Sequence, residues 1–442
     1  MNSSSSGPAR SRVVRGAVLL RLPIGALGDA IEGFARKLRG EDAALVRRRL
    51  RRRQADRTTT VLTGLKGGAQ KSGQLLSTLE ALLPPDPEAT WSQALTVMQE
   101  RGAALPLDAM EPVLRGCFGS RWRDRFLVFD DSGAAAASIG QVYRATWHDG
   151  HEVAVKVQYP GIDKAIASDL SMLALALRMA GFVAKGMAMP PLVAELRTRL
   201  HDELDYVGEA SRQRRFAEAY RGSAEFLVPD VVDVGPGVLV SDWIEGTPLS
   251  AVIASGTQDE RDHVALLYQR FMLGAPSVCG LLHTDPHPGN FRLMPDGRLG
   301  VLDFGSALEM PGGLPDTFGR LITTLLGESD AQVLDALREH GLVRAGARID
   351  VRALRDYLKP FTDPARHEVF TYSRDWLREQ FGQVNDPRNP DFLVALQLTL
   401  PPEHLFTHRV WLGVVGVLAA LEATVPVRSE LLALMPGFNP VA

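Results

Sequence analysis

One segment in the second half of the chain restricts the fold more than any other feature. His283, Asp285 and Asn290 lie on a short loop rich in proline and glycine, with the sequence His-Thr-Asp-Pro-His-Pro-Gly-Asn. Two short apolar runs follow, separated by the turn residues Pro295-Asp296-Gly297, and the second run leads into Asp303-Phe304-Gly305. Because this pattern predicts a β-hairpin, we expect the hairpin to bring Asp303 back beside Asn290.

The residues gathered in this way are suited to handling phosphate. Asp285 can orient or deprotonate an attacking hydroxyl, or position a water molecule. The side-chain oxygen of Asn290 and the carboxylate of Asp303 suit Mg²⁺, a hard cation that prefers oxygen ligands. Their order and spacing match the His-x-Asp-x-x-x-x-Asn catalytic loop and the Asp-Phe-Gly motif of kinases, which bind Mg-ATP. Each motif alone is also compatible with a turn that carries a chance aspartate.

An upstream strand supplies a candidate phosphate-binding lysine. The run Val153-Ala154-Val155-Lys156 alternates as a strand does, and kinases place the lysine of such a strand on the α and β phosphates. A partner carboxylate would hold this lysine in its productive rotamer, and we expect Glu209, on a predicted helix, to supply it. Taken singly, a strand lysine near a turn is usually exposed, and a glutamate on a helix is usually a surface acid.

The loop before this strand departs from that of a protein kinase. Kinases carry Gly-x-Gly-x-x-Gly here, whereas this chain has Ala134-Ala135-Ala136-Ala137-Ser138-Ile139-Gly140. Glycine allows positive φ and close backbone approach, so alanines predict a stiffer, bulkier loop and poor phosphoryl transfer to protein substrates. We expect the nucleotide to contact this loop at Ala135, Ala136, Ala137 and Ser138, and the adenine to contact a hinge at Asp242, Trp243 and Ile244.

The periodicity of the chain places these motifs in two kinds of structure. Short strands are expected at 126–129, 141–146, 153–158, 228–234 and 237–241, and helices are expected at 107–118 and, except around 282–303, from Thr257 onward. Strands followed by helices indicate a two-lobed α+β enzyme. The expected domains are a flexible leader and basic helical segment (1–60), a helical extension (61–125), a sheet-containing lobe with inserted helices (126–245) and a mainly helical lobe (246–442).

Together the motifs resemble one family. Lys71-Ser72-Gly73-Gln74 matches the Lys-x-Gly-Gln signature of the UbiB/ABC1/ADCK (AarF) family of atypical kinases. The alanine-rich loop, Glu203-Leu204-Asp205, the Asp-Pro-His-Pro-Gly-Asn loop and Asp-Phe-Gly follow in the order typical of that family. The resemblance implies a two-lobed protein-kinase-like fold with a helical N-terminal extension carrying the Lys-x-Gly-Gln motif, and a cleft between the lobes that binds ATP and Mg²⁺.

The resemblance also implies roles that composition and spacing do not assign. In the family, the Lys-x-Gly-Gln helix folds over the nucleotide cleft, where it restricts the access of protein substrates. Lys71 and Gln74 would then form a lid, and Lys71 would face Glu203 and Asp205. The family is implicated in the metabolism of ubiquinone and other isoprenoid lipids, so an isoprenoid lipid or a quinone precursor is the implied partner.

Charge and hydropathy bear on location. The net charge of −3 argues against binding of nucleic acid. The arginine-rich run Arg47–Arg53 predicts a solvated helix face or, as the sharper hypothesis, peripheral contact with an anionic membrane. The apolar segment Val410–Ala420 is shorter than the roughly 20 residues that a spanning helix needs, so we expect a buried helix there. Cys117 and Cys279 are the only cysteines, which fits a reducing compartment and a cytoplasmic location.

Two alternatives to an atypical kinase or ATPase remain open. One is a phosphotransferase that acts on a small molecule or a lipid, because His-Pro-Gly-Asn is similar to the loop of the aminoglycoside phosphotransferases; its acceptor pocket would have to be open to Asp285. The other is a nucleotide-binding scaffold of a biosynthetic complex with negligible turnover. The presence of Asp285, Asn290 and Asp303 together argues against a dead site.

Overall fold

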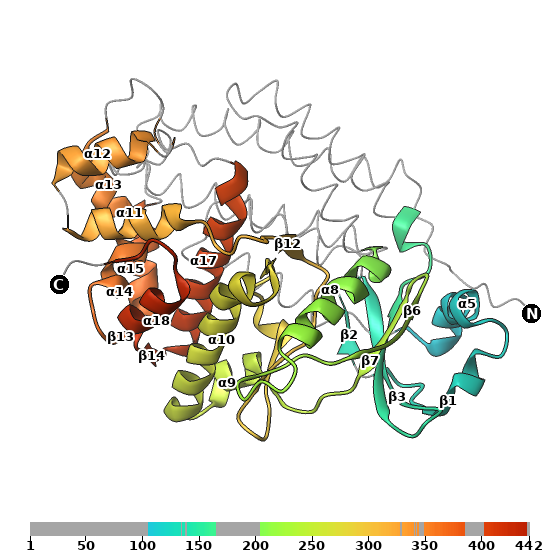
Figure 1. Cartoon of the computed structure of the whole chain (residues 1–442). Coiled ribbons are helices and arrows are strands. Elements are labelled where there is room, and N and C mark those ends of the chain that lie inside the picture. The colour runs from blue at the N-terminus through green and yellow to red at the C-terminus, as the bar shows by residue number, and fades with distance from the viewer. Residues whose placement is uncertain are drawn as a thin grey trace, which may run out of the picture. The chain divides into compact units, whose positions relative to one another are not determined.

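The computed structural model of the chain describes residues 105–133, 135–137, 139–164, 204–327, 329–339, 341, 343, 349–384 and 402–439. The predictions for Arg47–Arg53 and for the Lys-x-Gly-Gln extension concern residues outside these ranges. The described residues form two compact units (Figure 1). Of the described residues, the sheet unit holds those up to Asp205 together with Gly235–Leu239, and the helical unit holds Tyr206–Val234 and those from Val240 onward.

The sheet unit is built on the strands that the alternating sequence predicts. It contains α5 (Leu107–Phe118), η2 (Trp122–Arg125), β1 (Phe126–Phe129), β2 (Ala135–Ala136), β3 (Gly140–Trp147) and β4 (Glu152–Gln158). Strand β3 pairs antiparallel with β1, β2 and β4. On β4, Val153, Val155 and Val157 are fully buried, and Lys156 lies on the opposite, partly exposed face. The period of two therefore decides which side chains enter the core.

Aromatic side chains pack where β1 meets β3. The ring of Phe126 lies edge-on to Phe129 and to Trp147, with ring centroids 5.1 Å apart in both pairs. Trp122 of η2 is buried and approaches Phe129 with a centroid distance of 5.1 Å. Edge-to-face pairs of this kind stabilise a core beyond the area that they bury. The cluster packs the short strand β1 against β3.

A second hairpin runs from the helical unit into the sheet unit and back. It consists of β6 (Val231–Gly235) and β7 (Val238–Asp242), and its tip belongs to the sheet unit. There the Gln158 N–H donates to the Gly237 carbonyl at 2.8 Å, and the strand order is β1-β3-β4-β7-β6. Gly237 has a φ of +72°, which glycine adopts without strain. Both predicted strands are present, with their bounds shifted toward the C-terminus.

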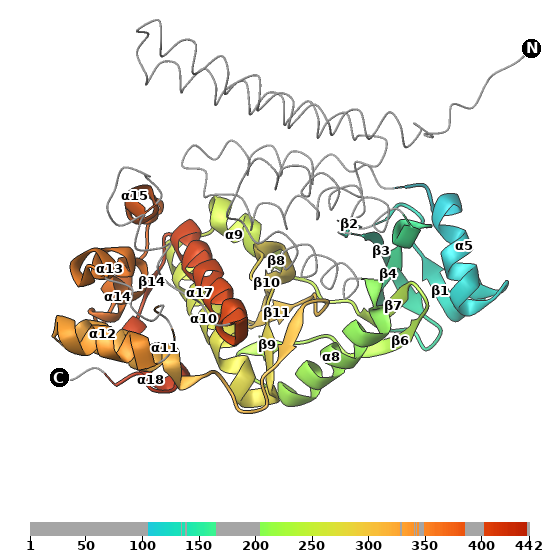
Figure 2. The ribbon, with the colours of Figure 1, turned by 90° about the horizontal axis from the view of Figure 1, so that it is seen from above.

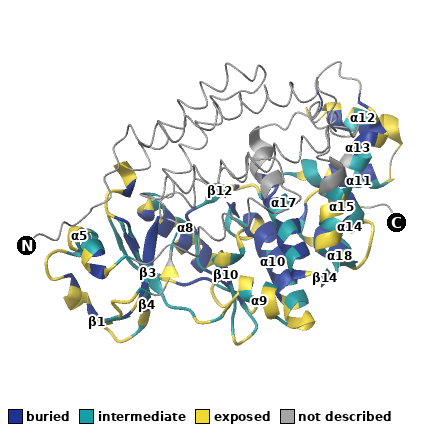
Figure 3. Ribbon diagram, turned by 180° about the vertical axis from the view of Figure 1, so that it is seen from behind, coloured by how far each residue is buried: buried dark blue, intermediate teal, exposed yellow. Residues whose placement is uncertain are grey.

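The helical unit surrounds one long buried helix. Its first part contains α8 (Tyr206–Ala219), β5 (Phe226–Leu227), β8 (Thr247–Pro248), α9 (Leu249–Ser255), α10 (Gln258–Cys279), β9 (Leu281–His283), η3 (Pro288–Asn290), β10 (Phe291–Leu293), β11 (Leu299–Val301) and β12 (Ala307–Glu309). A capping box formed by Thr257 and Glu260 starts α10, and Gly280, with a φ of +68°, ends it. The buried face of α10 lies at the centre of the core (Figure 3).

The second part of the helical unit packs partly against α10 and partly around a separate hydrophobic core. It contains α11 (Asp316–Gly327), α12 (Asp330–Glu339), α13 (Val351–Tyr357), α14 (Lys359–Ala365), β13 (Phe370–Thr371), α15 (Arg374–Val384), α17 (Pro402–Leu421), β14 (Thr424–Val425) and α18 (Val427–Leu434). Helices α10 and α17 lie side by side (Figure 2). Val410, Val414 and Leu418 of α17 are buried, as the sequence predicts for this segment. Within the described ranges, no helix combines the length and apolar character needed to cross a membrane.

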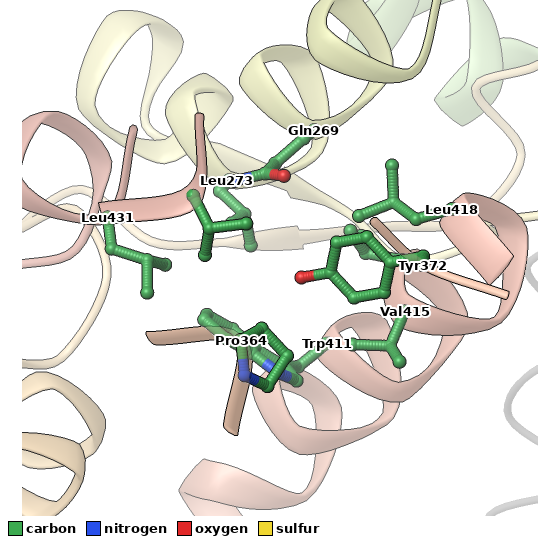
Figure 4. A pocket seen from close by; sticks show the side chains of 10 residues that line it. Gln269, Leu273, Pro364, Tyr372, Trp411, Val415, Leu418 and Leu431 are labelled. Carbon is green, nitrogen blue, oxygen red and sulfur yellow. The ribbon is translucent and has the colours of Figure 1, made fainter. Parts of the chain in front are cut away.

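A small cavity lies between α10, α14, α17 and α18. Its walls include Gln269, Leu273, Tyr372, Trp411, Val415 and Leu418 (Figure 4). Its volume is about 10 Å³, which is room for about one water molecule. Gln269 is 3% exposed, and its Oε1 atom accepts no hydrogen bond from any described residue. Substitution of Gln269 can test how this buried acceptor affects stability.

Candidate active site

The predicted catalytic loop joins β9 to the β10–β11 hairpin. In the hairpin, Phe291 lies opposite Val301 and Leu293 lies opposite Leu299. The Leu302 N–H then donates to the Asn290 carbonyl at 2.9 Å. The residues Pro295-Asp296-Gly297 therefore form the predicted turn of the hairpin, and the chain that carries Asp303 returns beside Asn290.

A direct hydrogen bond joins the side chains of Asp285 and Asn290. Asn290 Nδ2 donates to Asp285 Oδ2 at 2.8 Å, with a longer approach of 3.4 Å to the Asp285 carbonyl. The His287 N–H lies 3.4 Å from the other carboxylate oxygen, Asp285 Oδ1. Since the amide nitrogen of Asn290 faces Asp285, its amide oxygen is the atom suited to bind a cation. The pair thus presents a carboxylate for a nucleophile and an oxygen for a metal.

The backbone around Asp303 is held from the side of the catalytic loop. His283 is fully buried, and its Nε2 donates to the Asp303 carbonyl at 2.6 Å. Strand β12 pairs with β9 so that Ala307 lies opposite His283, and the Thr284 N–H donates to the Ser306 carbonyl at 3.1 Å. The residues that precede Asp285 and those that follow Asp303 therefore form one hydrogen-bonded unit.

Glu209, on α8, lies close to the Asp303-Phe304-Gly305 segment. Its side chain is 2% exposed. A Cβ added to Gly305 would lie 3.2 Å from Asp303 Oδ1 and 3.8 Å from Glu209 Oε2. Both carboxylates thus border Gly305, which is why glycine suits this position. Lys156, the predicted partner of Glu209, belongs to the sheet unit, so their pairing stays a prediction.

Two further helices contact the predicted catalytic loop, and the sequence predicts the helices but not these contacts. Tyr268 of α10 donates its hydroxyl to the Pro286 carbonyl at 2.7 Å. Burial and, to a smaller extent, the Asp285 carboxylate raise the pKa of Tyr268 well above its usual value, so the hydroxyl remains a donor. A Cβ added to Gly413 of α17 would lie 2.2 Å from Pro286 Cγ. No local sequence signal points to contacts between segments so far apart in the chain.

In the sheet unit, Lys156 shares a face with the alanine-rich loop. Val142 on β3 lies opposite Ala135 on one side and opposite Lys156 on the other. Residues directly opposite one another on antiparallel strands point to the same face of the sheet. The Ala137 N–H donates to the Gly140 carbonyl at 2.9 Å and closes the loop. Asp205 follows Leu204, whose carbonyl accepts from Gln158 Nε2 at 2.8 Å.

The predicted hinge lies beside the β10–β11 hairpin. Asp242 ends β7, and its Oδ2 accepts from the Asp230 N–H at 3.3 Å. A Cβ added to Gly300 of β11 would lie 2.8 Å from Ile244 Cδ1, so Ile244 packs closely on the hairpin. Trp243 lies between these two residues in an irregular stretch. Strand β8, which follows the hinge, pairs with β10.

The remaining predicted site residues are not placed. Lys71, Gln74, Ser138 and Glu203 lie outside the described residues. Within the described ranges, no group of three or more His, Cys, Asp or Glu side chains is arranged to hold a metal ion. Asp303 and Asn290 nevertheless fit Mg²⁺, since that ion is usually bound through one or two protein oxygens, with phosphates and water completing its shell.

The comparison with protein families decides the affiliation. Residues 97–337 match the family model described as the ABC1 atypical kinase-like domain, which is more than half of the chain. The chain belongs to the ABC1 atypical kinase-like family. The membership of the UbiB/ABC1/ADCK family that the motifs predicted is therefore confirmed.

Similar proteins agree with this assignment. The chain is 29% identical over 451 residues to "Atypical kinase coq-8, mitochondrial" of Caenorhabditis elegans, covering 96% of this chain and 57% of that protein. It is 33% identical over 303 residues to "Atypical kinase COQ8, mitochondrial" of Schizosaccharomyces pombe, covering 66% of this chain and 47% of that protein. The chain thus spans about half the length of these curated relatives.

A solved structure is similar over nearly the whole chain. It is a Mycobacterium tuberculosis protein in complex with erythromycin, with 38% sequence identity, a TM-score of 0.70, and coverage of 90% of this chain and 99% of that one. Together with the family match, it confirms the predicted two-lobed α+β protein-kinase-like fold. The family and the names of the relatives support a role of the kinase or ATPase type.

Proposed function

We propose that this chain is an atypical kinase or ATPase that binds Mg-ATP and supports the metabolism of ubiquinone or other isoprenoid lipids. The observation that carries the proposal is the arrangement of Asp285, Asn290 and Asp303, which the β10–β11 hairpin brings together. The lipid role rests on the family alone. Location in the cytoplasm, with peripheral attachment to a membrane, is part of the same proposal.

Each residue has a distinct task in this proposal. Asn290 Oδ1 and the Asp303 carboxylate would hold Mg²⁺, which when bound neutralises charge on the phosphates. Asp285, kept in place by the Asn290 amide, would orient an attacking hydroxyl or water. Lys156, paired with Glu209, would bind phosphate oxygens. The loop Ala135–Ser138 and the hinge Asp242–Ile244 would contact the nucleotide, and Lys71, Gln74, Glu203 and Asp205 would form the lid.

The decisive experiment compares Mg²⁺-dependent ATP hydrolysis by wild type and Asp303→Asn. This substitution preserves shape and removes the charge, so we expect turnover to fall by about 100-fold or more. Asp296→Asn is the matched control, because Asp296 is an exposed aspartate in the turn of the same hairpin. Equal hydrolysis by wild type and Asp303→Asn contradicts the proposed metal site.

Two additions to this assay distinguish the remaining alternatives. Stimulation of hydrolysis by anionic liposomes supports a role at a lipid surface. Nucleotide binding without hydrolysis in every condition favours a scaffold, or a phosphotransferase whose small-molecule or lipid acceptor is missing from the assay. Replacing the arginines of Arg47–Arg53 with glutamine tests membrane contact, which is refuted if co-sedimentation with anionic vesicles is unchanged.

A second candidate function comes from the similar solved structure. That Mycobacterium tuberculosis protein was solved with erythromycin, and it matches 90% of this chain with 38% identity. We therefore propose binding of a macrolide as a property to test in this chain. Isothermal titration with erythromycin, with and without Mg-ATP, checks it. Absence of binding up to about 1 mM, which corresponds to about −4 kcal/mol, rejects it.

A further inference from the structure

Helix α8 makes a direct connection to the Asp303-Phe304-Gly305 segment through a side chain that no motif contains. Arg212 Nε donates to the Phe304 carbonyl at 2.9 Å, and Arg212 Nη2 donates to the Gly305 carbonyl at 2.9 Å. The residue is partly buried. In the part of the chain that the structure describes, Arg212 forms no ion pair, so its charge is directed at these two carbonyls.

The two bonds fix consecutive peptide groups. A guanidinium is a planar fork whose donors have a fixed geometry, so holding two neighbouring carbonyls restricts the orientation of both peptide planes. The Asp303 carbonyl is already held by His283 Nε2 at 2.6 Å. Three successive carbonyls, those of Asp303, Phe304 and Gly305, are thus held by side chains from two different elements, β9 and α8.

The conformation of this backbone determines where the Asp303 carboxylate points. Asp303 Oδ1 accepts the Gly305 N–H at 2.9 Å, and this N–H belongs to the same peptide group as the Phe304 carbonyl that Arg212 holds. Glu209 precedes Arg212 by one turn of α8, and its carboxylate also borders Gly305. Residues three apart on a helix lie on the same face, so α8 presents Glu209 and Arg212 together to this segment.

We propose that Arg212 is a positioning residue that couples α8 to Asp303. It holds the Phe304 and Gly305 carbonyls in the arrangement that aims the Asp303 carboxylate at the cation. Any displacement of α8 then changes the affinity of the metal site, because Glu209 and Arg212 move together. The inference extends the proposed function in its metal-binding part. We call the two hydrogen bonds from Arg212 to the Phe304 and Gly305 carbonyls the clamp. The clamp lies within the helical unit and does not require nucleotide.

The first test measures the clamp without any ligand. Hydrogen exchange of the amides of Phe304, Gly305 and Ser306 is compared in the full-length wild type, Arg212→Met and Arg214→Met. Arg214 is the matched control, because it is an exposed arginine on the same helix. We expect exchange at these amides to rise at least about tenfold in Arg212→Met, equivalent to about 1.4 kcal/mol, and to be unchanged in Arg214→Met. Unchanged exchange in Arg212→Met overturns the proposal.

The second test measures the consequence at the metal site. The Mg²⁺ concentration for half-maximal binding of ADP should rise at least about tenfold in Arg212→Met, equivalent to about 1.4 kcal/mol, while ADP binding in EDTA stays at the wild-type level. Arg212→Lys keeps the charge without the planar fork, so it should show the same Mg²⁺ shift with wild-type thermal stability. A Mg²⁺ requirement like that of wild type in both variants overturns the proposal. If wild type binds no ADP, the proposed function fails, and the exchange experiment still decides the clamp.

Discussion

Substitution of Gly413 by alanine tests how closely α17 supports the catalytic loop. A Cβ at this position would lie 2.2 Å from Pro286 Cγ and 2.7 Å from Pro286 Cβ, and Pro286 follows Asp285 directly. Ordinary contacts of a Cβ begin at 3.4 Å, so α17 or the loop must move by about 1.2 Å (3.4 minus 2.2). Proline is rigid and cannot rotate away. The strain must therefore reach the backbone next to Asp285.

Gly416 of the same helix provides a matched control. Among the described residues, no atom lies within 4 Å of a Cβ added there. Both substitutions gain the same helix propensity, about 1 kcal/mol, so the difference between them isolates the clash. Overpacking of this kind costs about 1 to 3 kcal/mol, and we expect Gly413→Ala to be less stable than Gly416→Ala by that amount. Urea unfolding followed by tryptophan fluorescence measures the difference.

The two variants should also differ in activity. A displacement of about 1 Å near a catalytic group can reduce turnover by about 100-fold, so Gly413→Ala should lower ATP hydrolysis strongly while Gly416→Ala leaves it unchanged. If the two variants match each other in both stability and hydrolysis, α17 does not position the loop, and the reasoning from this contact is wrong.

Three further predictions concern stability. Glu430 of α18 is 6% exposed and accepts hydrogen bonds from Arg270 Nε at 2.8 Å and Nη2 at 2.6 Å. Glu430→Ala should therefore lower the free energy of unfolding in urea by about 2 kcal/mol, whereas Glu368→Ala, at an exposed position, should leave it unchanged. Gln269→Met should raise the free energy of unfolding by about 1 kcal/mol, because the buried Oε1 of Gln269 has no hydrogen-bond partner among the described residues. Gln213→Met is the control and should lower the free energy of unfolding, because Gln213 Nε2 donates to the Pro229 carbonyl at 2.8 Å. Burial raises the pKa of Tyr143 to about 12, so its contribution to stability is complete below about pH 10, where an unfolded tyrosine begins to ionise, and is lost as the pH rises through about 12. Tyr143→Phe should therefore weaken the decline in stability across this alkaline range, and an unchanged decline refutes the assignment to Tyr143.

Local signals explain the parts of the fold that could be predicted. The helix expected at 107–118 is observed as α5 with the same bounds, and the strand expected at 126–129 is observed as β1. Thr257 and Glu260 mark the start of α10, and the Pro-Asp-Gly turn predicts the hairpin that returns Asp303 to Asn290. These features depend on residues close in sequence, so propensity, alternation and turn chemistry are sufficient to predict them.

Local signals do not predict which distant strands pair. Strand β5 pairs in parallel with β11, and β8 pairs with β10, although β5 and β8 are each only two residues long. A run of two residues has no period to read. These pairings join segments far apart in the chain, and they complete the sheet on which Ile244 of the hinge packs.

The sequence by itself determined the family, the kinase-like order of motifs and the residue types that handle phosphate and metal, because each motif is short and its chemistry belongs to its own side chains. Only the tertiary structure decided which other groups hold that chemistry in place. Arg212 clamps the backbone after Asp303, Tyr268 bonds the Pro286 carbonyl, and Gly413 packs against the Pro286 ring. These contacts arise where packed helices meet the loop, and no pattern along a single segment records which surfaces will meet.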